Sequence, residues 1–308
     1  MTEAGSGDAP AGGPRRESEA AESFEAHRRH LVGLAYRMLG SVAEAEDAVQ
    51  DTYLRWHRTD RAGVENAKAF LSRIVTRLCL DRLRSAQARR ETYVGPWLPE
   101  PVLDADTLAA ETASDYAADL SVGLMLALER LSPLERAAFL LHDVFDVGFS
   151  EIATLLERNE AACRQLAARA RNHVRTARPR FAVPPEVGST IVAAFAQAVQ
   201  SADTAALARL LAADAVLHSD GGGKKSAALN PIVGRDRIAR FFAGVATKFP
   251  DVLAAQRTAT INGLPGLLVT ESDGSLQTMA FEIVGAEITA IYFVRNPDKL
   301  AHLAARLQ

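Results

Sequence analysis

The residues of this chain with the clearest potential chemistry are arginines in the stretch FSEIATLLERNEAACRQLAARARNHVR, residues 149–175. From residue 161 to residue 180 every charged side chain is an arginine. A helix that is merely solvated usually mixes both signs of charge, and this one does not. A helix that enters the DNA major groove needs small residues for close approach, forked donors for base edges and cations for phosphates. At helical spacing such side chains share one face: Ala161, Arg164, Gln165 and Ala168.

The same stretch carries the start and stop signals of a helix-turn-helix. Ser150 is predicted to cap a short helix that ends at Leu156, and Asn159 to cap a second helix that begins at Glu160. Glu157 stands in the turn where glycine is frequent, which predicts a strained or differently shaped backbone there. We therefore expect a DNA-binding helix-turn-helix over these residues.

A second basic segment, AKAFLSRIVTRLCLDRLRSAQARR at residues 67–90, contains a single acid, Asp81. Its apolar residues recur at helical spacing, which predicts a helix with a wide buried face. The residues of that face are Phe70, Leu71, Ile74, Val75, Leu78 and Leu83. The arginines of this segment should form a local basic surface.

The helix before it, around EDAVQDTYLRW at residues 46–56, has the opposite charge on its outer side. Val49, Tyr53 and Trp56 fall on one side and read as an ordinary buried face. An acidic face would repel DNA and would suit a basic protein partner. That face also carries one apolar residue, and its members are Asp47, Gln50, Asp51 and Leu54.

Several segments separate these elements. A first helix is expected from about Ser23 to the stop at Gly40, after which Ser41 caps the acidic helix. Residues 92–118 include VGPWLPEPVLDAD, whose prolines predict an extended linker. Trp97 within it is typical of a docking anchor. A second proline-rich boundary, FAVPPEV, precedes the last part of the chain.

The C-terminal part changes character. Helices are expected at about 187–200, 203–212 and 235–248, with a short strand before the third helix and several strand-like runs after it. DGGGKK resembles a phosphate-binding loop only superficially, because His218 stands where such a loop needs glycine. We interpret it as a turn at the end of a strand. NPDKL predicts a helix start with Asn296 as the N-cap and Pro297 in the first turn.

Composition limits the alternatives. A chain of 308 residues should hold two or three domains, and a net charge of −3 excludes a uniformly basic coat. Two cysteines within helical patterns indicate apolar packing in a reducing compartment. No run approaches 18 apolar residues, so we expect no membrane span and a cytoplasmic protein. The first 22 residues read as a disordered tail.

Two motif sets resemble one known family. AEAEDAVQDTYLRW followed by AFLSRIVTRLCLDRLR resembles region 2 of bacterial sigma factors, and LERLSPLERAAFLLHDVFDVGFSEIATLLERNEAACRQLAARAR resembles region 4. The short linker between them resembles the extracytoplasmic-function (ECF) group. The C-terminal part resembles a SnoaL-like cone of the NTF2-like superfamily. WLPEP (97–101), DGGGK (220–224) and NPDKL (296–300) resemble the ECF group in which such a cone is fused to the sigma regions.

The resemblance implies a fold class and partners. Two all-α sigma domains, a helical bundle and a helix-turn-helix, would precede an α+β cone. The partners would be core RNA polymerase, through its β′ coiled coil and β flap, and promoter DNA. The implied domains are a tail (1–22), region 2 (23–91), a linker (92–118), region 4 (119–178), a second linker (179–186) and the cone (187–308).

The resemblance also implies residue roles. The polymerase-binding residues would be Asp47, Gln50, Asp51 and Leu54. Those at the −10 promoter element would be Arg73, Arg77, Arg82 and Arg84, with Asp81 orienting a neighbouring arginine. Those at the −35 element would be Glu160, Ala161, Arg164, Gln165, Arg169, Arg171 and Arg175. The interdomain regulatory residues would be Trp97, Pro99, Asp220, Gly221, Gly222, Gly223, Lys224, Asn296, Pro297, Asp298, Lys299 and Leu300.

Other functions stay open at this point. A one-component helix-turn-helix regulator with a ligand-sensing cone would dimerise on a palindrome and would need no acidic polymerase face. An enzyme with a DNA-binding appendage would need a pocket, which His218, Asp220 and Tyr292 could line. The cone contains no readable nucleophile–base pair or metal-ligand spacing, so we expect no enzyme, no metal and no cofactor. A small ligand in the cone remains a further possibility.

Overall fold

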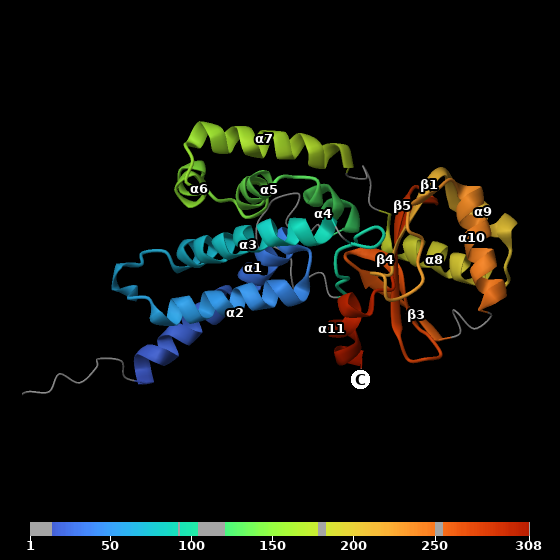
Figure 1. Ribbon diagram of the computed structural model, residues 1–308, viewed down its shortest axis with the longest axis horizontal. Helices are drawn as coiled ribbons and strands as arrows, with labels where there is room; N and C mark the ends of the chain where they lie inside the picture. The colour runs from blue at the N-terminus through green and yellow to red at the C-terminus, as the bar shows by residue number, and fades with distance from the viewer. Residues whose placement is uncertain (1–13, 92, 104–120, 178–182, 250–254, 308) are drawn as a thin grey trace, which may run out of the picture.

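The computed structural model describes residues 14–91, 93–103, 121–177, 183–249 and 255–307. Figure 1 shows a helical half beside a half that contains a β-sheet, with α11 in the seam between them. The helical half begins with α1 (Pro14–Leu39), α2 (Val42–Arg58), the short 3-10 helix η1 (Arg61–Gly63) and α3 (Ala67–Glu91). It continues with α4 (Val122–Glu129), α5 (Pro133–Phe139), the π-helical turn η3 (Leu140–Val144), α6 (Phe149–Leu156) and α7 (Glu160–Ala177).

Local signals set most of these boundaries. Helix α1 begins at Pro14 and not near Ser23, so residues 14–22, predicted as part of a disordered tail, are helical; residues 1–13 lie outside the described residues. Proline suits the first turn of a helix, because a backbone N–H in that turn would have no acceptor within the helix. Gly40 ends the helix in a left-handed conformation (φ 71°). The Ser41 hydroxyl then accepts a hydrogen bond from the backbone of Glu44 and caps α2, as predicted.

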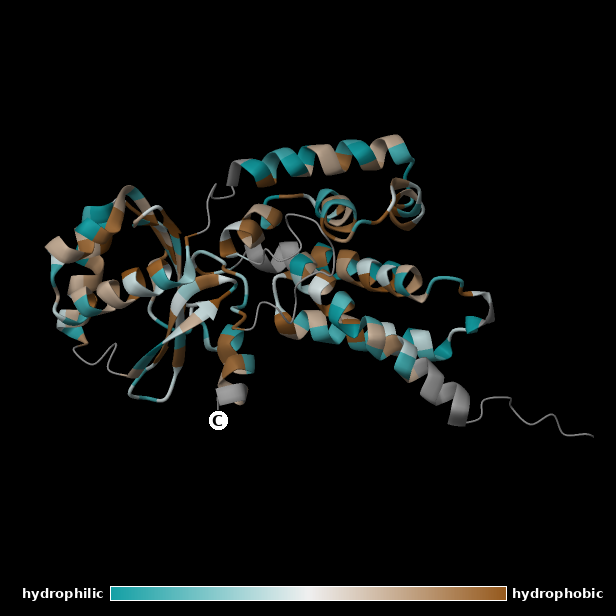
Figure 2. Ribbon diagram, turned by 180° about the vertical axis from the view of Figure 1, so that it is seen from behind, coloured by the Kyte–Doolittle hydropathy of each residue, from teal (hydrophilic) through white to brown (hydrophobic). Residues whose placement is uncertain are grey.

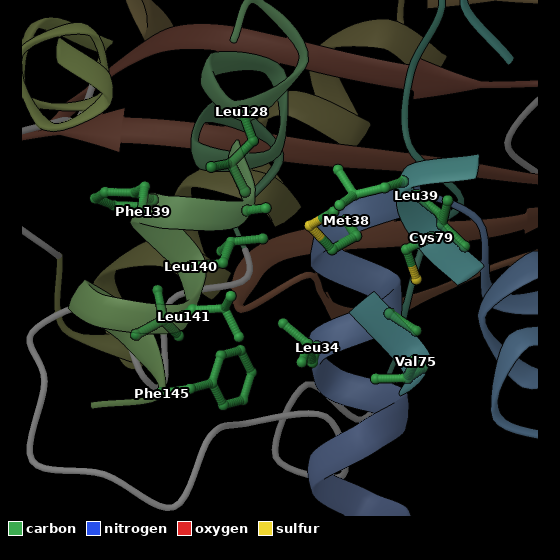
Figure 3. Packing of buried hydrophobic residues seen from close by; sticks show 14 of the residues in the cluster. Leu34, Met38, Leu39, Val75, Cys79, Leu128, Phe139, Leu140, Leu141 and Phe145 are labelled. Carbon is green, nitrogen blue, oxygen red and sulfur yellow. The ribbon is translucent and has the colours of Figure 1, made fainter. Parts of the chain in front are cut away.

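The helices of residues 14–91 and 121–177 share one apolar core. Figure 3 shows Leu140 and Phe145 pointing toward Leu34 and Met38 of α1, with Val75 and Cys79 of α3 beside them. The guanidinium of Arg136, which is only 2% exposed, donates hydrogen bonds to the carbonyls of Met38 (2.6 Å) and Leu128 (2.8 Å). Burial of these surfaces is worth roughly 25 cal/mol per Å². The two helical units are therefore packed together and are not separate bodies joined by a linker.

The remaining elements form the cone. They are α8 (Pro185–Gln200), α9 (Thr204–Leu210), β1 (Leu211–Asp220), β2 (Ile232–Val233), α10 (Arg235–Lys248), β3 (Ala255–Ile261), β4 (Leu264–Thr270), β5 (Leu276–Val284), β6 (Glu287–Val294) and α11 (Pro297–Leu307). The sheet order is β2-β1-β6-β5-β4-β3, with β1 parallel to β6 and the other neighbours antiparallel. The first strand was predicted to be short, but it has 10 residues and shortens the helix expected at 203–212.

Strand alternation gives the sheet two different buried faces. Leu217 on β1 and Phe293 on β6 point toward α8, α9 and α10, where Phe195, Phe242 and Phe281 pack edge to face. The alternate residues of each strand point to the opposite face of the sheet. That outer face packs against the linker, α4 and α11, through Tyr292, Val294, Leu98, Val122, Leu300 and Leu303. Among the helices that the structure describes, none has the length and apolar content needed to cross a bilayer.

Candidate functional site

The helix-turn-helix is formed by α6 and α7. The Asn159 side chain accepts a hydrogen bond from the backbone of Ala162 (2.8 Å), so α7 begins at Glu160, as predicted. The predicted cap of α6 is wrong: Gly148 precedes the helix, and Ser150 already lies inside it. Glu157 ends α6 in the left-handed conformation (φ 54°), which confirms the unusual turn expected from its position.

The outer face of α7 carries the residues that were predicted to read DNA. Figure 2 shows hydrophilic and hydrophobic residues interleaved along the whole of α7, as expected for a helix with one buried side. The buried side contains Cys163, Ala167, Ala170 and Val174. The exposed residues include Glu160, Ala161, Arg164, Gln165, Ala168, Arg169 and Arg175. Small and forked side chains therefore do share one exposed face.

The arginines of α7 differ in their surroundings. Arg164 pairs with Glu160 (2.7 Å) and lies over the Phe149 ring, which holds its guanidinium on the exposed face. Arg169 pairs with Glu135 of α5 (2.9 Å). Arg171 is placed differently from its predicted role at DNA. It is half-buried and pairs with the half-buried Asp143 of η3 (2.7 Å), so it anchors α7 to the helical core. Most of the acids that pair with the arginines of α7 lie on other elements. The sequence of α7 alone does not reveal these pairs.

The arginines of α3 also divide into groups. Arg73 lies over the Phe70 ring, and Arg77 forms an ion pair with Glu157 of the helix-turn-helix (2.9 Å). Arg84 is exposed and pairs with Asp81 (3.3 Å), in line with the orienting role expected of that acid.

Arg82 is a correction to the predicted −10 surface. Its guanidinium donates hydrogen bonds to the Asp51 carboxylate (2.8 Å) and to the carbonyl of Glu44 (2.7 Å), both on α2. Arg82 therefore joins α3 to α2 and does not stand on an open basic surface. The reason is tertiary, because the helical spacing of Arg82 does not show which helix lies across from it.

The acidic face of α2 is open at three of its four predicted residues. Asp47 and Gln50 are exposed, and Leu54 is 47% exposed. Asp51 is held by Arg82. The open face thus combines one acid, one amide and one apolar residue.

A third group of residues surrounds Asp220, which is fully buried at the end of β1. Its carboxylate accepts hydrogen bonds from the Tyr93 hydroxyl (2.6 Å), the Leu98 backbone (2.9 Å) and the Lys299 ammonium (2.7 Å). Burial and the neighbouring carboxylate raise the pKa of Tyr93, so this phenol stays a donor. We call Tyr93, Leu98, Asp220 and Lys299 the Asp220 cluster. It joins the linker, β1 and α11.

The other motif residues surround that cluster. The Asn296 amide donates a hydrogen bond to the Tyr93 hydroxyl (2.8 Å). Its side-chain oxygen accepts from the backbone N–H of Asp298, so Asn296 caps α11, which begins at Pro297 as predicted. Gly222 has φ 57°, and a Cβ there would lie 2.2 Å from the Asn296 amide, so the close approach requires glycine. The remaining residues of the motifs lie around them: Gly221 and Gly223 in the turn, Lys224 paired with Asp298 (2.6 Å) at the surface, and the buried Pro99 and Leu300.

Trp97 joins the same cluster to the N-terminal helices. Its ring lies under the Lys299 ammonium at 4.2 Å and against Gly40, where a Cβ would come within 2.5 Å of the ring. Glu100 caps α2 by accepting from the Ser41 hydroxyl and the Val42 backbone, both at 2.7 Å. The linker is therefore held on both sides, by α1 and α2 and by the cone.

Sequence reasoning missed three residues of this arrangement. Tyr93 and Glu100 lie in or beside the linker motif but were not chosen, although buried phenols and carboxylates need partners. Asn262 was read only as a turn residue. In the structure it is buried, donates to the Tyr36 hydroxyl (2.7 Å) and accepts from the Val102 backbone (3.0 Å). Its signal, an Asn-Gly pair, predicts a turn and gives no sign of a contact with the linker.

The pocket suggested for an enzyme is not formed by the residues proposed for it. His218 and Tyr292 stack on each other on the outer face of the sheet (ring centroids 5.6 Å apart). The Tyr292 hydroxyl donates to Glu282 (2.8 Å), and Asp220 is covered by the linker. Burial lowers the pKa of His218. Within the described residues no group of three or more His, Cys, Asp or Glu side chains is placed to hold a metal.

Comparison with known proteins decides the family. Residues 23–89 match the Sigma-70 region 2 family and residues 121–174 match Sigma-70 region 4. Over 290 residues, 90% of this chain and 91% of the relative, the sequence is 39% identical to the ECF RNA polymerase sigma factor SigJ of Mycobacterium tuberculosis. The chain belongs to the ECF RNA polymerase sigma factors. Residues 192–296 of this sigma factor match the SnoaL-like domain family.

Two further similarities concern the full length. The sigma factor is 31% identical to the probable ECF RNA polymerase sigma factor SigI of Mycobacterium tuberculosis, over 92% of this chain and 96% of the relative. The crystal structure of Mycobacterium tuberculosis SigJ superposes with a TM-score of 0.72 at 36% identity, covering 91% of this chain and 98% of that one. The predicted fold class and sigma function are confirmed, and neither alternative, a one-component regulator or an enzyme, is supported.

Proposed function

We propose that this sigma factor binds core RNA polymerase through the open face of α2, formed by Asp47, Gln50 and Leu54. The observation that carries the proposal is the exposed Leu54 beside an exposed acid on an otherwise well-packed helix. In this proposal the open face of α2 meets the β′ coiled coil and the region 4 helices meet the β flap, as the resemblance to sigma factors implies. Asp51 contributes indirectly, because its carboxylate fixes Arg82 between α2 and α3.

A charge reversal tests this surface. Asp47→Arg should weaken binding to core polymerase at least tenfold, because it opposes a basic partner at close range, while stability should change by less than about 0.5 kcal/mol at this exposed site. Asp236→Arg on α10, also an exposed acid, is the matched control. Affinity is measured by titrating labelled sigma factor with core polymerase. Unchanged affinity in Asp47→Arg would remove the assignment.

We further propose that promoter DNA is contacted by two surfaces. The first is the exposed face of α7, at the −35 element. The second is the basic side of α3 with Arg73, Arg77 and Arg84, at the −10 element. Because Arg77 is paired with Glu157 of the helix-turn-helix, contact between Arg77 and DNA requires that pair to break. The two helical units also share one apolar core, and we propose that this packed arrangement is a form that rearranges on the promoter.

The third part of the proposal is that the cone regulates this rearrangement. The three linker-facing motifs meet in the Asp220 cluster, and Trp97 reaches from that cluster to Gly40. A coupling of about 2–3 kcal/mol between cone and linker would shift the population of packed and rearranged forms by one to two orders of magnitude. Initiation from a cognate promoter in vitro should therefore differ between the full-length chain, Trp97→Ala and a chain that ends near Pro185. Equal activity of all three would make the cone a passive appendage.

A further inference from the structure

A cavity of about 660 Å³ lies inside the cone, between α10 and the ends of β1, β5 and β6. Phe241, Val245 and Phe293 supply apolar walls. A cavity of this size and composition suits a small organic molecule. It lies on the inner face of the sheet, because Phe293 points to that face, whereas the Asp220 cluster lies on the outer face.

Two hydrogen-bonding groups in the cavity wall have no partner among the described residues. The Ser219 hydroxyl is one, on a residue only 1% exposed. The Arg295 Nε is the other, although the terminal nitrogens of that guanidinium bond to Ser226 and Glu271. A buried polar group left unpaired is costly, and native proteins contain few of them. Both atoms are shielded in this structure, so an oxygen acceptor on a bound molecule would bond to them by displacing the wall around Ser219 and Arg295.

The charges around the cavity favour an anionic acceptor. Lys225 forms ion pairs with Glu271 (2.7 Å) and Asp273 (2.8 Å), and Glu271 also pairs with Arg295 (2.5 Å). Lys248, at the exposed rim, adds a third cation against these two acids. The wall therefore carries one more positive than negative charge, next to unpaired donors.

The cavity and the Asp220 cluster share the same strand ends. Ser219 lines the cavity and is followed directly by Asp220, whose side chain points to the opposite face. Arg295 lines the cavity and donates its backbone N–H to the carbonyl of Asp220 (2.7 Å). A molecule that moves Ser219 or Arg295 must therefore move the backbone that positions the Asp220 carboxylate.

We propose that this cavity binds a small molecule with an apolar body and a carboxylate, and that occupancy alters the contact between Asp220 and the linker. The second half of this inference rests on the proposed regulatory function of the cone. The first half does not, because binding to the cavity can be measured without RNA polymerase or DNA.

The probe is biphenyl-4-carboxylate, titrated into the full-length chain by isothermal titration calorimetry. With about 15 non-hydrogen atoms and an ordinary binding efficiency, its dissociation constant should be on the order of 0.5 mM. Biphenyl-4-carboxamide has the same shape without the charge and should bind at least threefold more weakly. Absence of binding below about 10 mM, or equal affinity for both probes, would overturn the proposed carboxylate site.

Variants locate the site. Ser219→Ala should weaken binding of the carboxylate probe about three- to tenfold, the range for one lost hydrogen bond. It should not lower stability, since the hydroxyl has no partner among the residues that the structure describes. Lys248→Glu should weaken the carboxylate probe and leave the carboxamide unchanged. Arg240→Glu, an exposed site on the same helix outside the cavity wall, is the control. Unchanged affinity in both Ser219→Ala and Lys248→Glu would place the probe elsewhere and end the proposal.

Hydrogen exchange of the Leu98 amide tests the coupling, since this N–H donates directly to Asp220. Saturating probe should change its exchange rate at least threefold in the wild-type chain and not in Ser219→Ala. Binding with unchanged Leu98 exchange would refute the coupling while the cavity assignment stands. Changed exchange with unchanged transcription would instead count against the proposed regulatory function.

Discussion

The buried pair of Lys299 and Asp220 gives the sharpest prediction about what holds the linker to the cone. Their side chains are 8% and 0% exposed, and the nitrogen–oxygen distance is 2.7 Å. At an effective dielectric constant of about 20, the Coulomb attraction at that distance is about 6 kcal/mol, much of which offsets the cost of removing both charges from water. Removing one partner leaves the other charge buried without its counter-ion. Lys299→Met should therefore lower the free energy of unfolding by about 3 kcal/mol.

The size of this loss follows from what remains around Asp220. Without Lys299 the carboxylate keeps the Tyr93 hydroxyl and the backbone N–H groups of Leu98 and Gly222, so the loss should lie at the lower end of the usual range. Neutralising the acid as well, in Asp220→Asn with Lys299→Met, should recover about 2 kcal/mol relative to the sum of the single changes. Lys224→Met is the matched control, because its pair with Asp298 is exposed and should contribute less than about 0.5 kcal/mol.

Two measurements check the prediction. Urea unfolding of the four chains of the cycle, with the control, gives the coupling free energy. Hydrogen exchange of the Leu98 amide reports on the linker itself, and its protection should fall on the order of 30- to 150-fold in Lys299→Met if the linker detaches locally. A coupling below about 0.5 kcal/mol, or unchanged Leu98 protection in a destabilised Lys299→Met, would show that the linker is held by apolar packing and that the ionic argument is wrong.

The remaining predictions concern DNA and pH. Arg164→Ala should cost about 1–3 kcal/mol on a cognate −35 sequence and little on other sequences, whereas Arg175→Ala should weaken all DNA and flatten the salt dependence; equal losses in fluorescence-anisotropy titrations would refute the division. Burial, more than the nearby Lys68, lowers the pKa of His30 to about 3. In the unfolded chain this histidine binds a proton below about pH 6.5, whereas in the folded chain it does so only below about pH 3. The free energy of unfolding is therefore undiminished above about pH 6.5 and falls by about 1.4 kcal/mol per pH unit between about pH 6.5 and pH 3. Between pH 7 and pH 5 the wild-type chain should lose about 2 kcal/mol more than His30→Gln in urea unfolding, and an equal loss would contradict the shifted pKa.

Helical periodicity and capping signals were enough to predict most local structure. Ser41, Asn159 and Asn296 each lie at a helix start, as their side chains require, and Gly40 ends α1. The apolar stripe of α7 also faces inward as predicted. These features depend on interactions within one or two helical turns, so the sequence contains all the information they need. The misplaced start of α6 lies within the usual uncertainty of helix ends, whereas α1 begins more than two turns before its expected start near Ser23.

The sequence alone was also enough to propose the two functional surfaces, through the combination of acid and leucine on α2 and the arginines of α7. It did not determine which arginines are free to act. Arg82 and Arg171 have the same residue type and helical setting as Arg77 and Arg169, and all four pair with carboxylates from other elements. Arg82 and Arg171, however, are half-buried in their pairs, whereas Arg77 and Arg169 stay exposed. Such pairs are decided by which elements lie side by side, and helical spacing does not encode that.

The same limit applies to the linker. Its prolines predicted an extended segment, and the resemblance grouped three motifs, but only the tertiary structure shows that Asp220 is buried beneath Leu98 and Tyr93. A glycine-rich turn after a strand is locally indistinguishable from a flexible loop. It becomes a rigid contact here because burial removes water, and the Asp220 carboxylate must then find its donors on residues about 80 to 130 positions away in the chain.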